Sequence, residues 1–153
     1  MAEVERSRHP CRVADARPPA PADVAGTALP AHLVRVATAS GATICERCQV
    51  ADTVASRMRG LLGRQELPAG EGVWIRPSNS IHMFFMRFAI DAVFLDRSGT
   101  VLRLAPGLEP WRMASCRRAR SVLELAAGEI ERRGLQVGDV LEEVALDAGG
   151  LAA

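Results

Sequence analysis

Short apolar runs separated by turn residues recur through the middle of the chain. Residues 32–38 (HLVRVAT) are apolar and rich in β-branched side chains, and residues 43–50 continue the pattern after the turn dipeptide SG. Residues 91–96 and 100–105 (DAVFLD and TVLRLA) flank the turn RSG in the same way. Two such runs around a short glycine-containing turn are typical of a β-hairpin. The pattern therefore predicts two hairpins.

Three further segments have strand character. They are residues 73–76 (VWIR), residues 121–125 (SVLEL) and the run after the turn residues Gly138 and Asp139. Together with the hairpins they indicate about seven strands.

Two segments have the features of helices. In residues 53–62, Asp52 is a good N-cap and Gly63 fits the left-handed position after a helix. Four apolar side chains in this segment share one helical face: Val54, Met58, Leu61 and Leu62. A second, short helix is predicted in AAGEIERRG, which ends at Gly134.

Many short strands with two short helices favour the α+β class over a doubly wound sheet. We expect a strongly curved, mostly antiparallel sheet or small barrel, formed by one domain over residues 31–147. Residues 1–30 are rich in Pro, Ala and Arg and have no hydrophobic period. They predict a disordered tail that folding does not need. Residues 148–153 are expected to form a flexible C-terminus.

Charge and composition exclude several classes of function. The net charge is +1, so no global field favours nucleic acid or an anionic membrane. All 19 basic residues are Arg, which the codon bias of a GC-rich genome explains without any role in phosphate binding. No secretory h-region and no membrane span is present in the sequence. These features favour a soluble, cytoplasmic protein with reduced thiols.

Cys45 and Cys48 have the two-residue spacing of a zinc knuckle or a redox pair. They lie in a predicted strand, where residues three apart point to opposite faces. No second pair exists, so His82 and Cys116 would have to complete a zinc site. We therefore predict no metal and no cofactor, with one thiol buried and the other near the surface.

Residues 80–96 (SIHMFFMRFAIDAVFLD) contain all four Phe of the chain, yet His82, Arg87 and Asp91 interrupt the apolar run. Charges in such a setting are costly unless they are paired. On a straight strand Arg87 and Asp91 would lie about 13 Å apart, too far for contact. Either the chain bends between them or each charge has another partner.

A ligand pocket would explain these groups. Phe84, Phe88 and Trp111 could form its apolar wall, since pockets combine such walls with a few polar groups. The candidate ligand-binding residues are His82, Arg87, Asp91, Trp111, Arg112 and Glu124. Arginine would favour an anionic ligand, because it grips carboxylate and phosphate groups in a bidentate manner.

Three functions remain open from the residues. The first is binding of a small, anionic ligand or a protein partner without catalysis. The second is an enzyme in which His82 works with Asp91 or Glu124 as an acid–base pair, although no known catalytic motif is present. The third is an RNA-contacting accessory protein that uses Trp111 and the nearby arginines. The balanced charge disfavours this third function.

Several motifs, in their order and spacing, resemble one known family. The motifs are ADTVASRMRGLLGR, LPAGEGVWIRP, SIHMFFMRFAIDAVFLD, PWR and SVLELAAGEIERRGLQVGD. Over residues 45–142 the chain is identified as a member of the family called domain of unknown function 192, also catalogued as uncharacterised protein family 0127. The resemblance implies no established activity.

Overall fold

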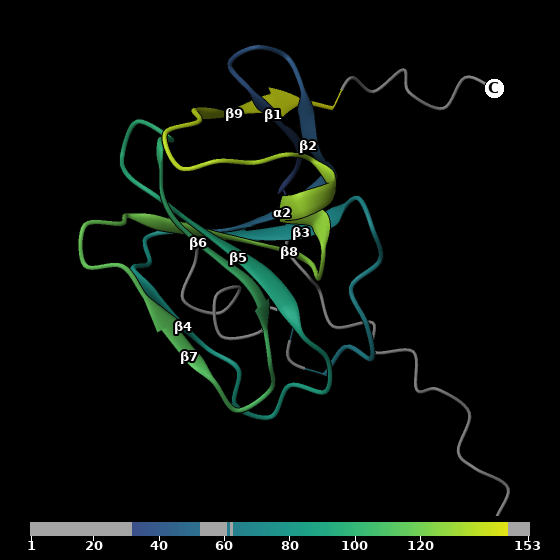
Figure 1. The fold of residues 1–153 in the computed structure, drawn as a ribbon. Coiled ribbons are helices and arrows are strands. Elements are labelled where there is room, and N and C mark those ends of the chain that lie inside the picture. The colour runs from purple at the N-terminus through teal and green to yellow at the C-terminus, as the bar shows by residue number, and fades with distance from the viewer. Residues whose placement is uncertain (1–31, 53–60, 62, 147–153) are drawn as a thin grey trace, which may run out of the picture.

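The computed structural model describes residues 32–52, 61 and 63–146. Seven strands of this region form one mostly antiparallel sheet, which curls strongly into a half-barrel (Figure 1). Its strands, in spatial order, are β6 (Val101–Leu108), β5 (Ile90–Leu95), β8 (Ser121–Ala126), β3 (Glu71–Ile75), β2 (Thr43–Ala51), β1 (His32–Thr38) and β9 (Leu141–Ala145). The strands β4 (Ser80–His82) and β7 (Met113–Ser115) form a separate two-stranded ribbon.

Both predicted hairpins are confirmed. β1 pairs with β2, and β5 pairs with β6, in antiparallel register. Within the seven-stranded sheet, the pairing of β2 with β3 is parallel, and the connection between them contains residues 53–60, outside the described region. An isolated bridge between Thr100 and Val140 joins the start of β6 to the start of β9 and tightens the curl.

The predicted curved, mostly antiparallel sheet is confirmed, but only one of the two predicted helices is. The described residues contain one helix, α2 (Glu129–Arg132), in the segment AAGEIERRG. The helix predicted over residues 53–62 lies almost entirely outside the described residues. The predicted tails, residues 1–30 and 148–153, also lie outside them.

The sheet separates two apolar cores. The concave core, between the sheet and α2, contains Trp74, Leu123 and Ile130. The second core lies on the opposite face, where Val73, Phe94 and Val122 pack with residues of the ribbon such as Ala114. Consecutive strand residues face opposite sides of a sheet, so Val73 and Trp74 belong to different cores. Among the described residues, no helix is long and apolar enough to cross a membrane.

The prediction that Cys45 and Cys48 face opposite sides of β2 is wrong. Both are fully buried in the concave core. The pairing of β1 with β2 shifts register between Val34 and Val36, and such a bulge changes the alternation of side chains. Two sulfurs three residues apart therefore meet on one face. The thiol of Cys48 hydrogen-bonds Cys45, which lowers the pKa of Cys45 and raises that of Cys48.

Candidate functional site

Asp91 is fully buried at the start of β5 and faces the concave core. Its two oxygens accept hydrogen bonds of 2.8 Å from the backbone N–H groups of Gly107 and Ile130. Arg87 instead donates to Gln65 at 3.2 Å. The sequence left open whether a bend brings Arg87 and Asp91 together or each charge has another partner. In the structure each charge has its own partner. Asp91 fixes α2 and the end of β6, and its oxygens are occupied.

Glu124 lies on β8 beside Ala92 of β5 and Val73 of β3. These neighbours face the second core, so Glu124 and Asp91 are on opposite faces of the sheet. Burial raises the pKa of Glu124 to about 7. Its carboxyl makes no hydrogen bond or ion pair with another residue in the described ranges. Glu124 is a buried acid without a described partner.

The other predicted site residues lie at one end of the ribbon. The rings of His82 and Phe84 stack at 5.0 Å, and Phe84 lies 6.1 Å from Trp111. The backbone of Arg112 accepts a hydrogen bond from Met83 at 2.8 Å. The structure thus brings His82, Trp111 and Arg112 together, but it does not bring Asp91 or Glu124 into contact with them.

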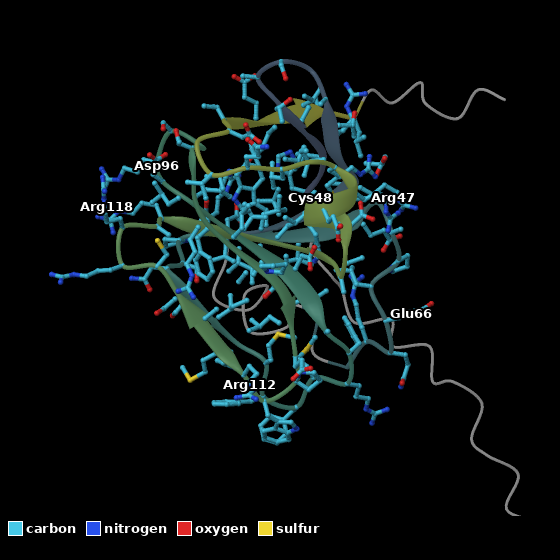
Figure 2. All side chains as sticks on the ribbon, viewed as in Figure 1. Arg47, Cys48, Glu66, Asp96, Arg112 and Arg118 are labelled. Atoms are coloured by element: carbon cyan, nitrogen blue, oxygen red, sulfur yellow. The ribbon has the colours of Figure 1, made fainter. Side chains whose placement is uncertain are left out.

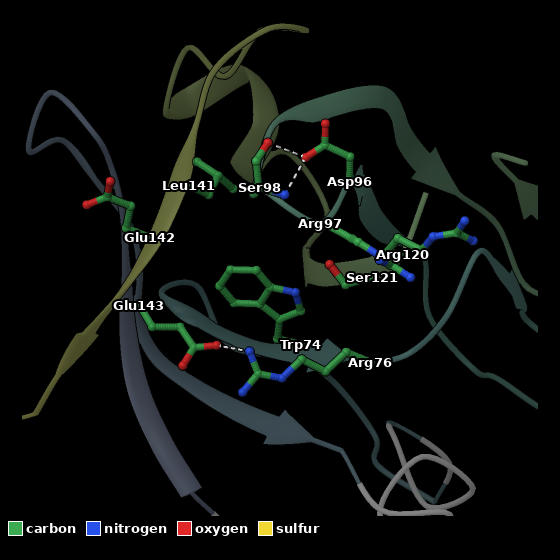
Figure 3. A pocket seen from close by; sticks show the side chains of 11 residues that line it. Trp74, Arg76, Asp96, Arg97, Ser98, Arg120, Ser121, Leu141, Glu142 and Glu143 are labelled. Atoms are coloured by element: carbon green, nitrogen blue, oxygen red, sulfur yellow. Dashed lines mark hydrogen bonds and ion pairs between the residues drawn. The ribbon is translucent and has the colours of Figure 1, made fainter. Parts of the chain in front are cut away.

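A cavity of about 410 Å³ opens at the opposite end of the molecule, between β3, β9 and the β5–β6 turn (Figure 3). It lies at the edge of the concave core and is open to solvent. Its lining residues are Trp74, Arg76, Asp96, Arg97, Ser98, Gly99, Arg120, Ser121, Leu141, Glu142 and Glu143. This volume is within the range of small-molecule sites.

Trp74 forms the floor of this cavity, which we call the Trp74 pocket. Its side chain is 5% exposed, and its indole Nε1–H has no hydrogen-bond partner among the described residues. Figure 3 shows this nitrogen on the side of the ring that faces Ser121 and Arg97. Buried indole N–H groups usually find an acceptor, so this donor is unused among the described residues.

Three charged groups of the Trp74 pocket have partners among the described residues. The guanidinium of Arg76 lies over the indole ring at 5.9 Å and forms an ion pair with Glu143. Asp96 accepts hydrogen bonds from Ser98 and Thr100. The Ser98 hydroxyl makes the largest contribution to lowering the pKa of Asp96. These three charged groups are therefore satisfied within the protein.

Arg97 and Arg120 are the uncompensated cations of the pocket. Both are exposed, and neither forms an ion pair with a described residue. Ser121, also in the lining, is buried and its hydroxyl makes no hydrogen bond with a described side chain or backbone group. Glu142 points away from the indole in Figure 3. The lining thus contains two guanidinium groups and a hydroxyl without described partners, and the buried indole N–H lies beneath this surface.

Sequence reasoning missed the Trp74 pocket because its walls come from four separate segments. One signal was available: Trp74 lies between apolar residues in a short predicted strand, and a Trp buried in a strand needs an acceptor for its N–H. No group of three or more potential metal ligands is present among the described residues.

The fold and the pocket define a small β-rich half-barrel domain. The model of the DUF192 family, an uncharacterized ACR, matches residues 35–143, and the chain belongs to this family. The resemblance seen in the sequence is confirmed. A UPF0127 protein of Thermococcus sibiricus is 35% identical over 102 residues, which cover 63% of this chain and 65% of that protein. The chain thus matches less than two thirds of that relative's length.

Other similar proteins agree with this assignment. A UPF0127 protein of Pyrococcus furiosus is 36% identical over 98 residues, which cover 60% of this chain and 82% of the relative. A crystal structure from Sinorhizobium meliloti, described as a proposed transcription regulator, has a TM-score of 0.64 and 27% identity, and the match covers 72% of this chain and 92% of that one. A protein of unknown function from Novosphingobium aromaticivorans has a TM-score of 0.62 and 26% identity, with 72% and 83% covered.

Proposed function

We propose that this domain binds a small organic carboxylate in the Trp74 pocket and does not catalyse a reaction. The observation that supports this most strongly is the buried indole N–H of Trp74, which lacks a described acceptor. A carboxylate oxygen would satisfy this donor once the lining side chains move to admit the ligand to the buried nitrogen. Leaving a buried donor unpaired costs about 1–3 kcal/mol, so a ligand that supplies the acceptor gains a substantial part of that free energy.

The charges of the pocket favour an anion. Arg97 and Arg120 line it without an ion pair among the described residues. Arginine binds carboxylates through paired N–H donors. The indole ring and Leu141 provide apolar surface next to these donors, so an organic acid fits the lining better than a bare inorganic anion does.

Catalysis by His82 with Asp91 or Glu124 has less support. Both oxygens of Asp91 already accept backbone hydrogen bonds. No hydrogen bond or ion pair joins His82 to either acid within the described ranges. Because Asp91 and Glu124 lie on opposite faces of the sheet, His82 could work with at most one of them without a rearrangement of the core.

The proposal is tested by calorimetric titration of the full chain with acetate, succinate, benzoate and inorganic phosphate at constant ionic strength. We expect saturable binding of at least one carboxylate. The double variant Arg97→Gln/Arg120→Gln should weaken that binding at least about tenfold, which corresponds to about 1.4 kcal/mol. Arg117→Gln is the matched control, since Arg117 is an exposed arginine of the same loop but outside the lining.

Two results would contradict the proposal. One is the absence of binding by all three carboxylates. The other is binding that the double variant leaves unchanged, because the ligand would then occupy another site. Binding of phosphate alone would contradict the assignment to organic acids.

A further inference from the structure

The ribbon carries an exposed apolar tip, formed by Phe85, Trp111 and Met113. These side chains are 72%, 60% and 65% exposed, respectively. The rings of Phe85 and Trp111 touch edge to face at 5.0 Å. Large exposed apolar groups that gather in one place mark interaction sites rather than ordinary surface. The Trp74 pocket does not include any of these residues, so its function leaves the tip unexplained.

The backbone holds these rings outward at an energetic cost. Phe85 and Trp111 have φ angles of 65° and 66°, a left-handed conformation that is unfavourable for bulky residues. Such strain persists where the surrounding structure fixes it, and it clusters at functional positions. Here the fixing contacts are mutual, since the N–H of Trp111 donates to the carbonyl of Met83 and the N–H of Met83 donates to Arg112, both at 2.8 Å.

These hydrogen bonds indicate whether the tip binds a lipid surface or a peptide strand. The N–H groups of Met83, Met86, Trp111 and Arg112 all donate to carbonyls within the tip or its base. Because these four N–H groups are paired internally, the base of the tip loses few hydrogen bonds to water when it lies at the edge of an apolar phase. This pairing also leaves those N–H groups unavailable to an added peptide strand. The tip is therefore suited to a lipid surface.

Charge next to the tip points to anionic lipid. Arg112 follows Trp111 directly, and Figure 2 shows its side chain at the lower end of the molecule. Arg87 is exposed and hydrogen-bonded to the neutral Gln65. Neither arginine forms an ion pair with a described residue. Glu109 is an exposed acid of the same loop. Each basic side chain near an anionic leaflet adds to the attraction between protein and membrane.

We propose that this tip inserts Phe85, Trp111 and Met113 into the interface of an anionic lipid bilayer, with Arg112 and Arg87 at the headgroups. Trp suits this position because its ring is apolar and its N–H is polar. The global charge of +1 does not favour membranes, so the attraction is local to this end of the molecule. Binding is peripheral and leaves the Trp74 pocket, at the opposite end, facing the aqueous phase.

Co-sedimentation of the full chain with vesicles of phosphatidylcholine and phosphatidylglycerol tests the proposal. We expect a bound fraction that falls at least about tenfold in Phe85→Asn/Trp111→Asn, because the apolar anchor is lost. Asn tolerates the left-handed conformation, so the double variant should keep the fold. Circular dichroism checks this. Val137→Asn is the control, since Val137 is 62% exposed in the α2–β9 connection, away from the ribbon in Figure 1.

Two further measurements separate lipid from other occupants. Brominated lipids should quench the emission of Trp111 in the native chain and leave Trp111→Phe unquenched, since the remaining Trp74 is buried. Arg87→Gln/Arg112→Gln should weaken binding to anionic vesicles but not to neutral ones. The proposal is overturned if the chain does not bind vesicles, if the Asn variant binds equally well, or if light scattering shows that the tip instead joins two copies of the chain.

Discussion

The carboxylate of Asp91 accepts a 2.8 Å hydrogen bond from the backbone N–H of Ile130, 39 residues further along the chain. Its other oxygen accepts a second bond, of the same length, from Gly107. One buried side chain thus connects the first turn of α2 to the end of β6. The rest of α2 is tied to β2, since Arg133 contacts both Glu129 and Glu46.

Asp91→Ala should lower the free energy of unfolding by about 3 kcal/mol, because it leaves two backbone N–H groups without acceptors in or near the core. Urea titration followed by circular dichroism measures this change. Asp139→Ala is the matched control, because Asp139 accepts a 2.8 Å bond from the backbone N–H of Gln136 at an exposed position. A loss no greater than that of Asp139→Ala would mean that Asp91 does not hold α2.

Glu124 predicts a specific pH dependence of stability. Its pKa in the folded state is raised to about 7, against an ordinary value of 4.5. Folding therefore favours the protonated acid. The contribution of Glu124 to the free energy of unfolding is fully present below pH 4.5 and is lost as the pH rises through about 7. At about 1.4 kcal/mol per unit of pKa, wild type should lose about 3 kcal/mol relative to Glu124→Gln between pH 4.5 and 8.

Denaturant titrations of both proteins across this pH range measure the difference. Glu124→Gln is a close match in size and stays neutral, so changes at other titrating groups cancel in the comparison. Parallel curves of unfolding free energy against pH for the two proteins would contradict this prediction. They would show that the folded protein ionises Glu124 at little cost in free energy.

Cys45 and Cys48 should be protected from thiol reagents in the folded protein. Both are fully buried, whereas Cys116 is partly exposed. In a Cys11→Ser/Cys116→Ser background, we expect modification of the remaining two thiols to be at least about 100-fold slower in the folded than in the unfolded chain, since reaction requires opening of the core. Equal rates would contradict the burial of the pair.

We also predict that the purified protein contains no stoichiometric zinc. The described residues offer no third ligand beside Cys45 and Cys48, and structural zinc sites use four protein ligands. Elemental analysis without chelators decides the question. One zinc per chain that is lost in Cys45→Ser would contradict the prediction.

Gly99 should be essential to the wall of the Trp74 pocket. An added Cβ would lie 2.3 Å from the carbonyl oxygen of Leu141, in a residue with φ of +81°. Gly41 has a similar φ of +92° but no atom within 4 Å of the added Cβ. Gly99→Ala should therefore cost about 1–3 kcal/mol more than Gly41→Ala in thermal or urea unfolding. Equal costs would mean that β9 can move away from the turn.

The hairpins and the short helix were predictable because their signals are local. The turns near Gly41 and Gly99 and the apolar runs beside them specify β1, β2, β5 and β6. The strand order is not local, and neither the parallel pairing of β2 with β3 nor the bulge that turns Cys45 and Cys48 to one face follows from periodicity. Register shifts depend on the partner strand, which a single strand's sequence does not show.

The candidate site was predictable only in part. The sequence indicated that the charges in residues 80–96 need partners inside the fold, which holds for the buried Asp91 but not for His82 and Arg87, which are exposed. It did not reveal that Asp91 uses backbone N–H groups, because donors 16 and 39 residues away leave no local pattern. The Trp74 pocket combines Trp74, Arg97, Arg120 and Leu141, which the strand order alone brings together.

The central claim is that the Trp74 indole N–H contacts a bound carboxylate, and nitrogen-15 NMR of this group tests it most directly. The chain has two Trp, so Trp111→Phe leaves one indole N–H signal. We predict that this signal moves saturably on titration with acetate, succinate or benzoate, and that Arg97→Gln/Arg120→Gln reduces the shift. A signal that stays in place with all three acids, or that moves equally with chloride at the same ionic strength, would contradict the claim.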